Sequence, residues 1–397
     1  MKRTWLTHNL RVVSAISLLQ DAASELMYPL LPIFLTVTLG APAAVVGAVE
    51  GIAEGAAALT KILAGRLSDR YPRRRLMGLG YALAALGKVV VAVATSWPVV
   101  LAGRSVDRLG KGIRGAPRDA LLVVDIPADA RGRAFGFHRA MDTAGAVVGP
   151  LLALAGYELL GHRLRPLLLI AVVPGVASAL LVLAVREART TPPDIDDQPT
   201  DDVTPAGAQP GPALPRRYWQ VVALVTAFSL VNFPDALILL RLNEIGFSLP
   251  GVVLAYAGFN AVYAALSLPA GMIADRLTPR LVFGLGLAVF AIAYTGLGLT
   301  RNAVAASALL VCYGAFAALT DGVGKAWISS LLPAERQGSG QGLFQGLSGA
   351  AVLAAGLWAG FAWGADGRTP LLISGGLAAL IAVGVLLATP LGTSRAR

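Results

Sequence analysis

The sequence predicts an all-α polytopic membrane protein, with twelve transmembrane helices in two pseudo-symmetric six-helix bundles. Composition, the number of apolar stretches and an internal repeat carry this prediction. Of the 397 residues, 56% are hydrophobic and 14% are charged, and the mean hydropathy is +0.67. These values leave too few polar side chains to coat a water-soluble globule of this size. We therefore expect lipid to be the solvent for most of the surface.

Apolar stretches divide the chain into twelve segments, each close to the roughly 20 residues that a transmembrane helix needs. The expected spans are 11–37, 43–66, 76–95, 97–118, 132–157, 165–187, 218–242, 250–273, 280–300, 303–326, 339–363 and 369–391. Residues 188–217 are mostly Pro-rich and Asp-rich and hold few large apolar side chains, so they cannot offset their ordering entropy by burial. We expect an N-terminal bundle over 1–187, a flexible cytoplasmic linker over 188–217 and a C-terminal bundle over 218–397.

Basic residues predict the orientation of these spans. They cluster at both termini and between the second and third spans, whereas the first-to-second and third-to-fourth connections hold no Lys or Arg. The positive-inside rule then places both termini in the cytoplasm, in a cell (cytoplasmic) membrane. Arg163 and Arg165 lie on the opposite side and weaken the rule without reversing it. The net charge of +10 has the same explanation, so we expect no nucleic-acid partner.

The two halves repeat short motifs in the same order. The first motif is a glycine followed four residues later by Asp-Arg, and the second is an aspartate followed by Gly-Lys at a fixed spacing. The matching pairs are Gly65, Asp69 and Arg70 with Gly271, Asp275 and Arg276, and Asp107, Gly110 and Lys111 with Asp321, Gly324 and Lys325. Such internal repeats are typical of secondary transporters.

The first of these motifs carries a resemblance to a known family. Residues 65–75, Gly-Arg-Leu-Ser-Asp-Arg-Tyr-Pro-Arg-Arg-Arg, resemble the cytoplasmic signature of the major facilitator superfamily between helices two and three, with Pro72 where a second glycine is usual. The resemblance covers essentially the whole chain. It implies that Gly65, Asp69, Arg70 and Arg73 latch the two halves together in the outward-open state. Physically, a carboxylate such as Asp69 can face the positive end of a neighbouring helix.

A second, partial resemblance lies in the fifth span. Gly136, Gly145, Gly149 and Pro150 have the spacing of a motif associated with the superfamily's antiporters, but the trailing glycine pair is replaced by Ala153 and Leu154. Glycines permit close helix approach and a proline bends a helix, which suits a gate. Simple packing of apolar helices would select the same small residues, so both interpretations stay open.

Ionisable residues inside the expected spans are the candidate functional residues, because each costs at least about 2.5 kcal/mol on insertion scales. The candidates for a substrate and proton pathway are Asp21, Glu25, Glu50, Glu54, Arg104, Asp107, Arg108, Lys111, His138, Arg139, Asp142, Asn232, Asp235, Asp321 and Lys325. We expect proton coupling at Asp107 beside Arg104, or at Asp142 one turn from His138. Asp21, Glu25, Glu50 and Glu54 could serve either protons or a cationic substrate. Static pairs that only hold the N-terminal bundle together are the alternative.

The sequence lacks the motifs that mark several other classes of function. The chain has no phosphate-binding loop and no His-Glu-x-x-His motif, and Cys312 is its only cysteine. We expect no cofactor, no metal and no enzymatic activity.

The leading expectation is a secondary active transporter that works by alternating access, with proton-coupled efflux by antiport of a small amphipathic or organic solute. Its partners would be that solute, protons and the lipid bilayer, and we expect a monomer. The alternatives are a proton-coupled importer of a polar or charged metabolite or a metal chelate, and, in another class, a non-transporting membrane receptor or scaffold.

Overall fold

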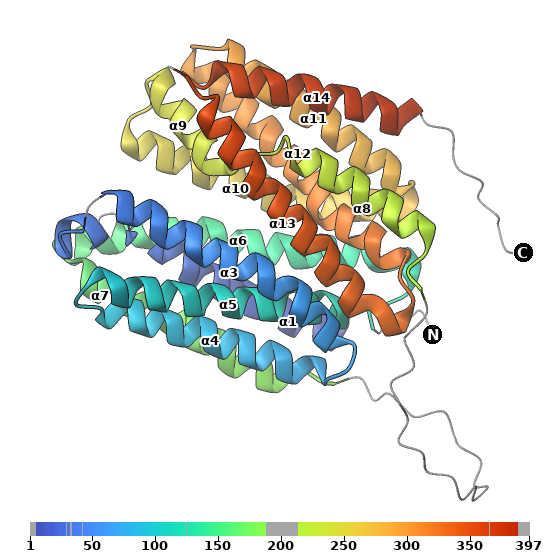
Figure 1. Cartoon of the computed structure of the whole chain (residues 1–397), viewed down its shortest axis with the longest axis horizontal. Helices are drawn as coiled ribbons and strands as arrows, with labels where there is room; N and C mark the ends of the chain where they lie inside the picture. The colour runs from blue at the N-terminus through green and yellow to red at the C-terminus, as the bar shows by residue number, and fades with distance from the viewer. Residues whose placement is uncertain are drawn as a thin grey trace, which may run out of the picture.

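The computed structural model describes residues 5–28, 30–31, 34–41, 43–124, 126–187, 213–364 and 366–387. Over these ranges all regular structure is helical (Figure 1). Most of the linker expected at 188–217 lies outside the described residues, as do both basic chain ends.

The first half of the chain forms a bundle of six long helices. They are α1 (His8–Met27), α3 (Ala43–Ser68), α4 (Arg73–Val93), α5 (Trp97–Leu122), α6 (Arg131–Leu159) and α7 (Leu164–Leu181), with the short segments η1 (Phe34–Thr38), η2 (Ala128–Ala130) and η3 (Val182–Ala184). Helix α5 packs between α3 and α4, and α1 packs between α6 and α7.

The second half forms a matching bundle. Its helices are α8 (Arg216–Ser229), α9 (Asp235–Ile245), α10 (Leu249–Arg276), α11 (Pro279–Leu299), α12 (Ala303–Ser330), α13 (Gln337–Phe361) and α14 (Arg368–Leu387), with the short η4 (Ala334–Arg336) before α13. Helix α11 packs between α12 and α14, and α10 packs against α12. Aromatic rings of α8, α11 and α12 form edge and stacked contacts in the core of this bundle.

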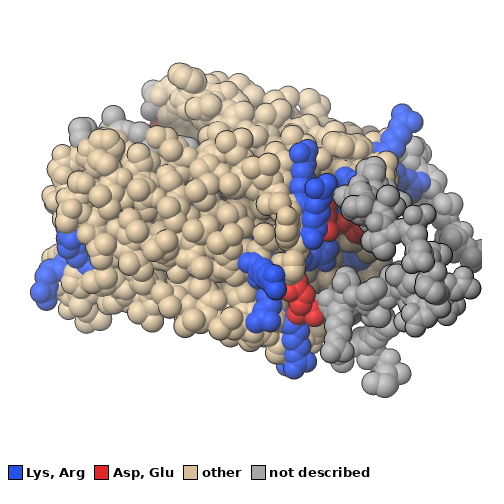
Figure 2. Space-filling view, turned by 60° about the horizontal axis from the view of Figure 1, so that its bottom comes forward, with Lys and Arg blue, Asp and Glu red and all other residues tan. Residues whose placement is uncertain are grey.

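The outer faces of both bundles are apolar. Large side chains such as Leu59, Val173 and Leu380 are 67–71% exposed, which a water-soluble surface would not accumulate. Figure 2 shows a wide surface without charge on one face of the molecule, bounded by Lys and Arg side chains. Eight helices of the described residues are long and apolar enough to cross a membrane. The structure therefore supports a polytopic helical membrane protein, while the count of twelve spans stays a prediction.

Two expected spans are interrupted. The span expected at 218–242 divides into α8 and α9, because Pro234 at the start of α9 has no amide hydrogen to continue the helical hydrogen bonds. The span expected at 11–37 divides into α1 and the π-helical η1. Both interruptions leave shorter helices than the apolar pattern predicts.

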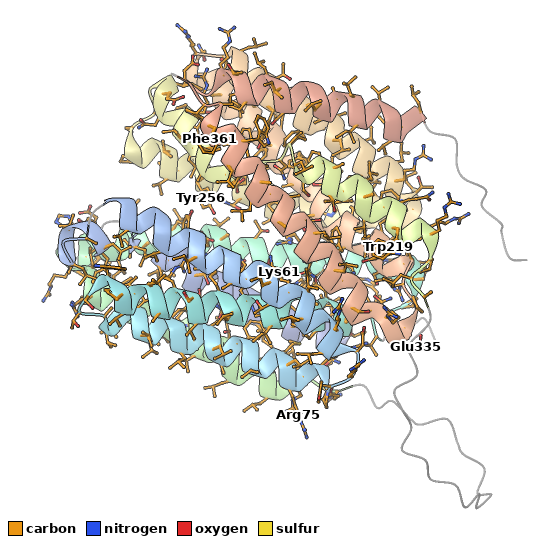
Figure 3. All side chains as sticks on the ribbon, viewed as in Figure 1. Lys61, Arg75, Trp219, Tyr256, Glu335 and Phe361 are labelled. Atoms are coloured by element: carbon orange, nitrogen blue, oxygen red, sulfur yellow. The ribbon has the colours of Figure 1, made fainter. Side chains whose placement is uncertain are left out.

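The two bundles meet at one end of the molecule, which we call the linker end and define by Ser68 of α3, Arg276 of α10 and Gln337 of α13. Contacts between the bundles run through α6 with α10 and α12, and through α13 with α3 and α5. Figure 1 shows α13 crossing from the second bundle toward this end of α3. The opposite end, marked by Phe361 in Figure 3, is called the far end.

Candidate functional site

A cavity of about 660 Å³ lies between the two bundles. Its basic lining residues are Lys61, Arg108, Lys111, Arg114, Arg118, Arg139 and Lys325, and its acidic ones are Asp21, Glu25, Asp142, Asp235 and Asp321. Five aromatic side chains also line the cavity: Tyr28, Phe233, Tyr256, Tyr313 and Phe344. Figure 3 shows Lys61 of α3 and Tyr256 of α10 where the bundles face each other.

Helix α1 supplies an acidic wall of the cavity. Asp21 and Glu25 are one turn apart, so they share a face of the helix, and both are half-buried. The Tyr256 hydroxyl donates a hydrogen bond to Glu25 across the bundles, at 3.3 Å. Gly145 and Gly149 of α6 pack against the α1 backbone beside these two carboxylates. The antiporter-like glycines therefore bring α1 and α6 together within one bundle.

Helix α5 supplies a basic wall. Arg108, Lys111 and Arg114 follow one another at three-residue spacing and all line the cavity. Lys111 is exposed, whereas Arg114 is only 5% exposed and lies 4.7 Å above the Tyr81 ring, measured from the guanidinium carbon to the ring centre. Both lie within electrostatic reach of Asp21 on α1.

Two ion bridges cross between the bundles on the linker-end side of the cavity. In the first, Arg139 of α6 contacts Asp321 of α12 at 2.6 Å and Asp142 of its own helix at 2.7 Å. The Tyr263 hydroxyl donates a second hydrogen bond to Asp321, also at 2.6 Å.

The second bridge joins α5 to α12. Lys325 contacts Asp119 at 2.9 Å, and the Gln345 amide donates to the same carboxylate at 3.0 Å. Arg118 contacts Asp119 at 3.0 Å and Asp142 at 3.8 Å, which links the two bridges. The Asp119 side chain is completely buried. The bridges therefore close this side of the cavity with opposite charges from both bundles.

The second bundle adds a smaller polar group at the break between α8 and α9. Asn232 lies in the break and Asp235 opens α9, and both line the cavity. The Tyr313 hydroxyl donates to Asp235 at 2.6 Å.

Three predicted residues lie away from the cavity lining. Asp107 is buried against Lys88 of α4 at 2.8 Å and Arg104 at 3.4 Å, because Gly87 lets α4 approach the α5 backbone closely at this level. Arg104 and Asp107 line a separate small void. His138 is 2% exposed and lies 3.4 Å from the Ser14 hydroxyl. Asp142 and His138, which the sequence pairs for proton transfer, therefore differ: Asp142 lines the cavity and His138 does not.

The signature motif contacts the opposite bundle at the linker end. The Asp69 carboxylate accepts hydrogen bonds from the backbone amides of Gly338 and Ser339, both at 2.8 Å, in the first turn of α13. Gly65 packs directly against the backbone of Gly342. Free amides and the helix dipole make such an N-terminus a favourable place for a carboxylate.

The repeated motif makes the same contact with the bundles exchanged. Asp275 of α10 accepts hydrogen bonds from the amides of Gly132 and Arg133, at 2.7 and 3.0 Å, in the first turn of α6. The Arg133 side chain also contacts Asp275 at 2.9 Å, and Gly271 packs against Gly132. The internal repeat therefore corresponds to a pair of pseudo-symmetric caps between the bundles.

The remaining signature and gating residues have different surroundings. Arg70 and Arg276 are exposed, and Arg73 donates to the carbonyls of Ser68 and Ala120 at 3.4 and 3.5 Å. Pro150 is buried inside α6, at the level of its contact with α1. The side chains of Glu50 and Glu54 lie outside the described residues.

Several site residues are missing from the predicted substrate and proton pathway. They are Lys61, Arg114, Arg118, Asp119, Tyr256, Tyr263 and Gln345. Arg114 and Arg118 belong to a basic series at helical spacing along the fourth span, and from the sequence we expect the lower part of this series to form an electropositive cytoplasmic mouth. The sequence predicts a span that ends at 118 and so leaves Asp119 outside it, whereas α5 continues to Leu122. Uncharged side chains such as Gln345 carry no signal of their own.

The family model of the Major Facilitator Superfamily matches residues 13–240 and 221–396. The chain belongs to the major facilitator superfamily. An uncharacterized MFS-type transporter of Methanocaldococcus jannaschii is 29% identical over 90% of this chain and 89% of its own length. Multidrug resistance protein MdtH of Edwardsiella ictaluri is 26% identical over 80% and 77%. The resemblance read from the signature motif is thereby confirmed.

Solved structures of the superfamily share this fold. The human organic anion transporter structure has a TM-score of 0.76 at 19% identity, covering 95% of this chain and 99% of that one. The fucose:proton symporter of E. coli has a TM-score of 0.73 at 14% identity, covering 95% and 97%. By family this superfamily member is a membrane-embedded transporter, and it shares the fold of these solved structures. Its described residues contain no group of three or more His, Cys, Asp or Glu side chains placed to hold a metal ion.

Proposed function

We propose that this chain is a proton-coupled secondary transporter that works by alternating access, and that it exports a small amphipathic or organic solute. The observation that carries the proposal is the charged cavity between the bundles, bounded toward the linker end by ion bridges that join one bundle to the other. Such bridges must break when that side opens, so they couple solute access to a rearrangement of charge. The similarity to a multidrug resistance protein supports the outward direction.

The linker end is proposed to face the cytoplasm. The signature loop there carries Arg66, Arg70, Arg73, Arg74 and Arg75, and Figure 2 shows Lys and Arg side chains gathered toward the same end. Because the inter-bundle caps hold this end closed, we assign the structure to an outward-facing state. Both termini and the linker then lie in the cytoplasm, as the positive-inside rule requires.

Asp21 and Glu25 are the proposed proton carriers. Both are half-buried, line the cavity and lie beside basic side chains of α5, which are the conditions under which a carboxylate binds and releases a proton during a cycle. Asp142 lines the cavity too, but two arginines hold it. Asp107, the earlier candidate, is enclosed by Lys88 and Arg104.

Proton-coupled import is the second candidate, and one observation favours it. Asp21 and Glu25 lie near Lys111, so an anion bound there would favour the protonated carboxylates. Anion and proton would then bind together, which is symport.

Proteoliposomes that contain a pH-sensitive dye and a loaded solute test both the function and its direction. During solute efflux, antiport acidifies the lumen and symport makes it more alkaline, whichever way the protein is inserted. Asp21→Asn with Glu25→Gln should abolish the pH change. A lumen pH that never responds to any solute, in protein that binds one of them, would instead support the receptor or scaffold hypothesis.

Asp107 needs a control that leaves the net charge of the buried cluster unchanged. Lys88→Gln with Asp107→Asn removes both charges of the pair, and proton coupling should survive this change. Loss of coupling there, with coupling retained in the Asp21 and Glu25 variant, would move the proton path to the buried cluster.

A further inference from the structure

The charges of the cavity are separated, and the basic side is in excess. Among the described lining residues, seven side chains are basic and five are acidic. Three of the basic ones, Arg118, Arg139 and Lys325, belong to the inter-bundle bridges and already contact carboxylates. The positive charge that faces the open volume therefore comes mainly from the α5 wall.

Arg114 is the most unusual member of that wall. It is 5% exposed and lines the cavity, yet its Nη1 atom has no hydrogen-bond partner within the described part of the chain. Its described contact is with the face of the Tyr81 ring. A buried guanidinium with unused donors is unfavourable unless an acceptor completes it.

Lys111 lies one turn from Arg114 on the same face of α5. Its side chain is exposed within the cavity lining, so its ammonium group can reach a ligand in the open volume. Three residues along a helix correspond to a rise of about 4.5 Å. The two side chains can therefore reach one small anionic group together.

We propose that Lys111 and Arg114 form an anion-binding site, and that this transporter carries a small organic anion whose charged group binds there. A guanidinium presents paired donors to a carboxylate, sulfonate or phosphate group, and a nearby ammonium adds a second positive charge. The apolar body of the ligand would lie against the aromatic lining, which includes Phe233, Tyr256 and Phe344. This inference rests on the proposed function in taking the cavity as the substrate site, and it does not depend on the direction of transport.

A cationic ligand would use the other wall. Asp21 and Glu25 would then be its partners, but Glu25 already accepts a hydrogen bond from Tyr256, and both acids lie within reach of Lys111. The α5 wall would repel such a ligand. We therefore assign the charge preference to anions.

Three naphthalene probes of the same size test this assignment by binding alone. They are naphthalene-2-sulfonate, the neutral naphthalene-2-sulfonamide and the cationic 2-naphthylmethylammonium, titrated into the full chain in lipid nanodiscs by calorimetry. We expect binding of the sulfonate and at least tenfold weaker binding of the other two. Equal binding of the three, preference for the ammonium probe or no binding of the sulfonate would overturn the proposal.

Variants then locate the site. Lys111→Gln and Arg114→Gln should each weaken sulfonate binding roughly tenfold to hundredfold, as expected for a lost hydrogen bond to a charged group. Arg368→Gln removes the same charge from an exposed position at the start of α14 and should change nothing. Lys111 is exposed, so its variant keeps the test valid even if the Arg114 variant does not fold. Unchanged affinity in Lys111→Gln would also overturn the proposal.

Flux measurements separate this inference from the proposed function. Sulfonate binding without flux of any solute supports the anion site and contradicts the transport proposal. Coupled flux of the ammonium probe, without sulfonate binding, supports transport and contradicts the anion site.

Discussion

Neutralising the two cap aspartates should open the linker end. Asp69 and Asp275 each accept two backbone amides from a helix of the opposite bundle. Asparagine keeps one acceptor oxygen at each cap but loses the negative charge and the second acceptor, a loss of about 1–2 kcal/mol. Asp69→Asn or Asp275→Asn should therefore shift the equilibrium between closed and open linker ends by about fivefold to thirtyfold.

The double variant is the sharper test. The two caps lie on different helices and share no partner, so their effects should add in free energy. The ratio of open to closed populations should then rise by roughly the product of the two single effects.

Distances between spin labels at the linker end measure this ratio. Arg75 and Glu335 are exposed residues of opposite bundles at that end, and both can be replaced by cysteine after Cys312→Ser. Pulsed electron spin resonance in nanodiscs should show a longer distance that gains population in each variant. Asp129→Asn is the matched control, because Asp129 is an exposed acid at the same end and its carboxylate caps no helix in the described structure. An unchanged distance distribution in the double variant would refute the reasoning.

Three further predictions use the same preparations. Arg241 is 3% exposed and donates to three backbone carbonyls near the far end. Arg241→Met should therefore lower the free energy of unfolding by about 3 kcal/mol, measured by denaturation in detergent. A loss smaller than about 1 kcal/mol would contradict this prediction. Lys88→Met should cost about 3 kcal/mol because it leaves Asp107 buried without its nearest partner, and adding Asp107→Asn should recover most of that loss; no recovery would show that the pair is not coupled. Asp142→Asn takes from Arg139 its partner within the same helix, so Arg139 would lose both contacts when the linker end opens. The population with an open linker end should therefore fall in the spin-labelled protein, and a rise would be the contrary result.

The fold and the contacts of the two motif aspartates have local signals in the sequence. Apolar stretches of transmembrane length predict helices, and the repeated glycine and aspartate occupy fixed places at helix ends. The same sequence spacing therefore gave the same contact twice, with Asp69 on α13 and Asp275 on α6. The break at Pro234 could also have been anticipated from the missing amide, but the apolar pattern on both sides concealed it.

The site was predictable only in part, because position along a helix does not fix which face meets the cavity. Arg104 and Asp107 lie near the middle of α5, as expected, but they face α4, where Lys88 neutralises the carboxylate. Lys111 lies on the cavity side of the same helix, whereas Arg114, two turns beyond Asp107, contacts Gly80 and Tyr81 of α4 and still lines the cavity. Which face meets the cavity depends on where the neighbouring helices pack. The Gly87 contact that sets the approach of α4 is a tertiary contact, so the sequence alone does not predict it.

The arrangement of the ion bridges explains how charged bundles can separate without leaving buried charges alone. Arg139 contacts Asp321 across the bundles and Asp142 within its own helix. Asp119 contacts Lys325 across the bundles and the neighbouring Arg118 within its own helix. Each of these residues of the first bundle keeps an opposite charge when the bundles part.

Residues of the second bundle also have partners within their own bundle. Lys325 follows Asp321 by four residues on α12, the spacing at which the two side chains can pair, and Tyr263 already donates to Asp321. Removing one partner of a buried pair costs about 3–5 kcal/mol because the other charge stays unpaired. In the proposed transport cycle, exchange from cross-bundle to same-bundle partners would avoid that penalty, so the bridges would hold the cavity closed and still release it.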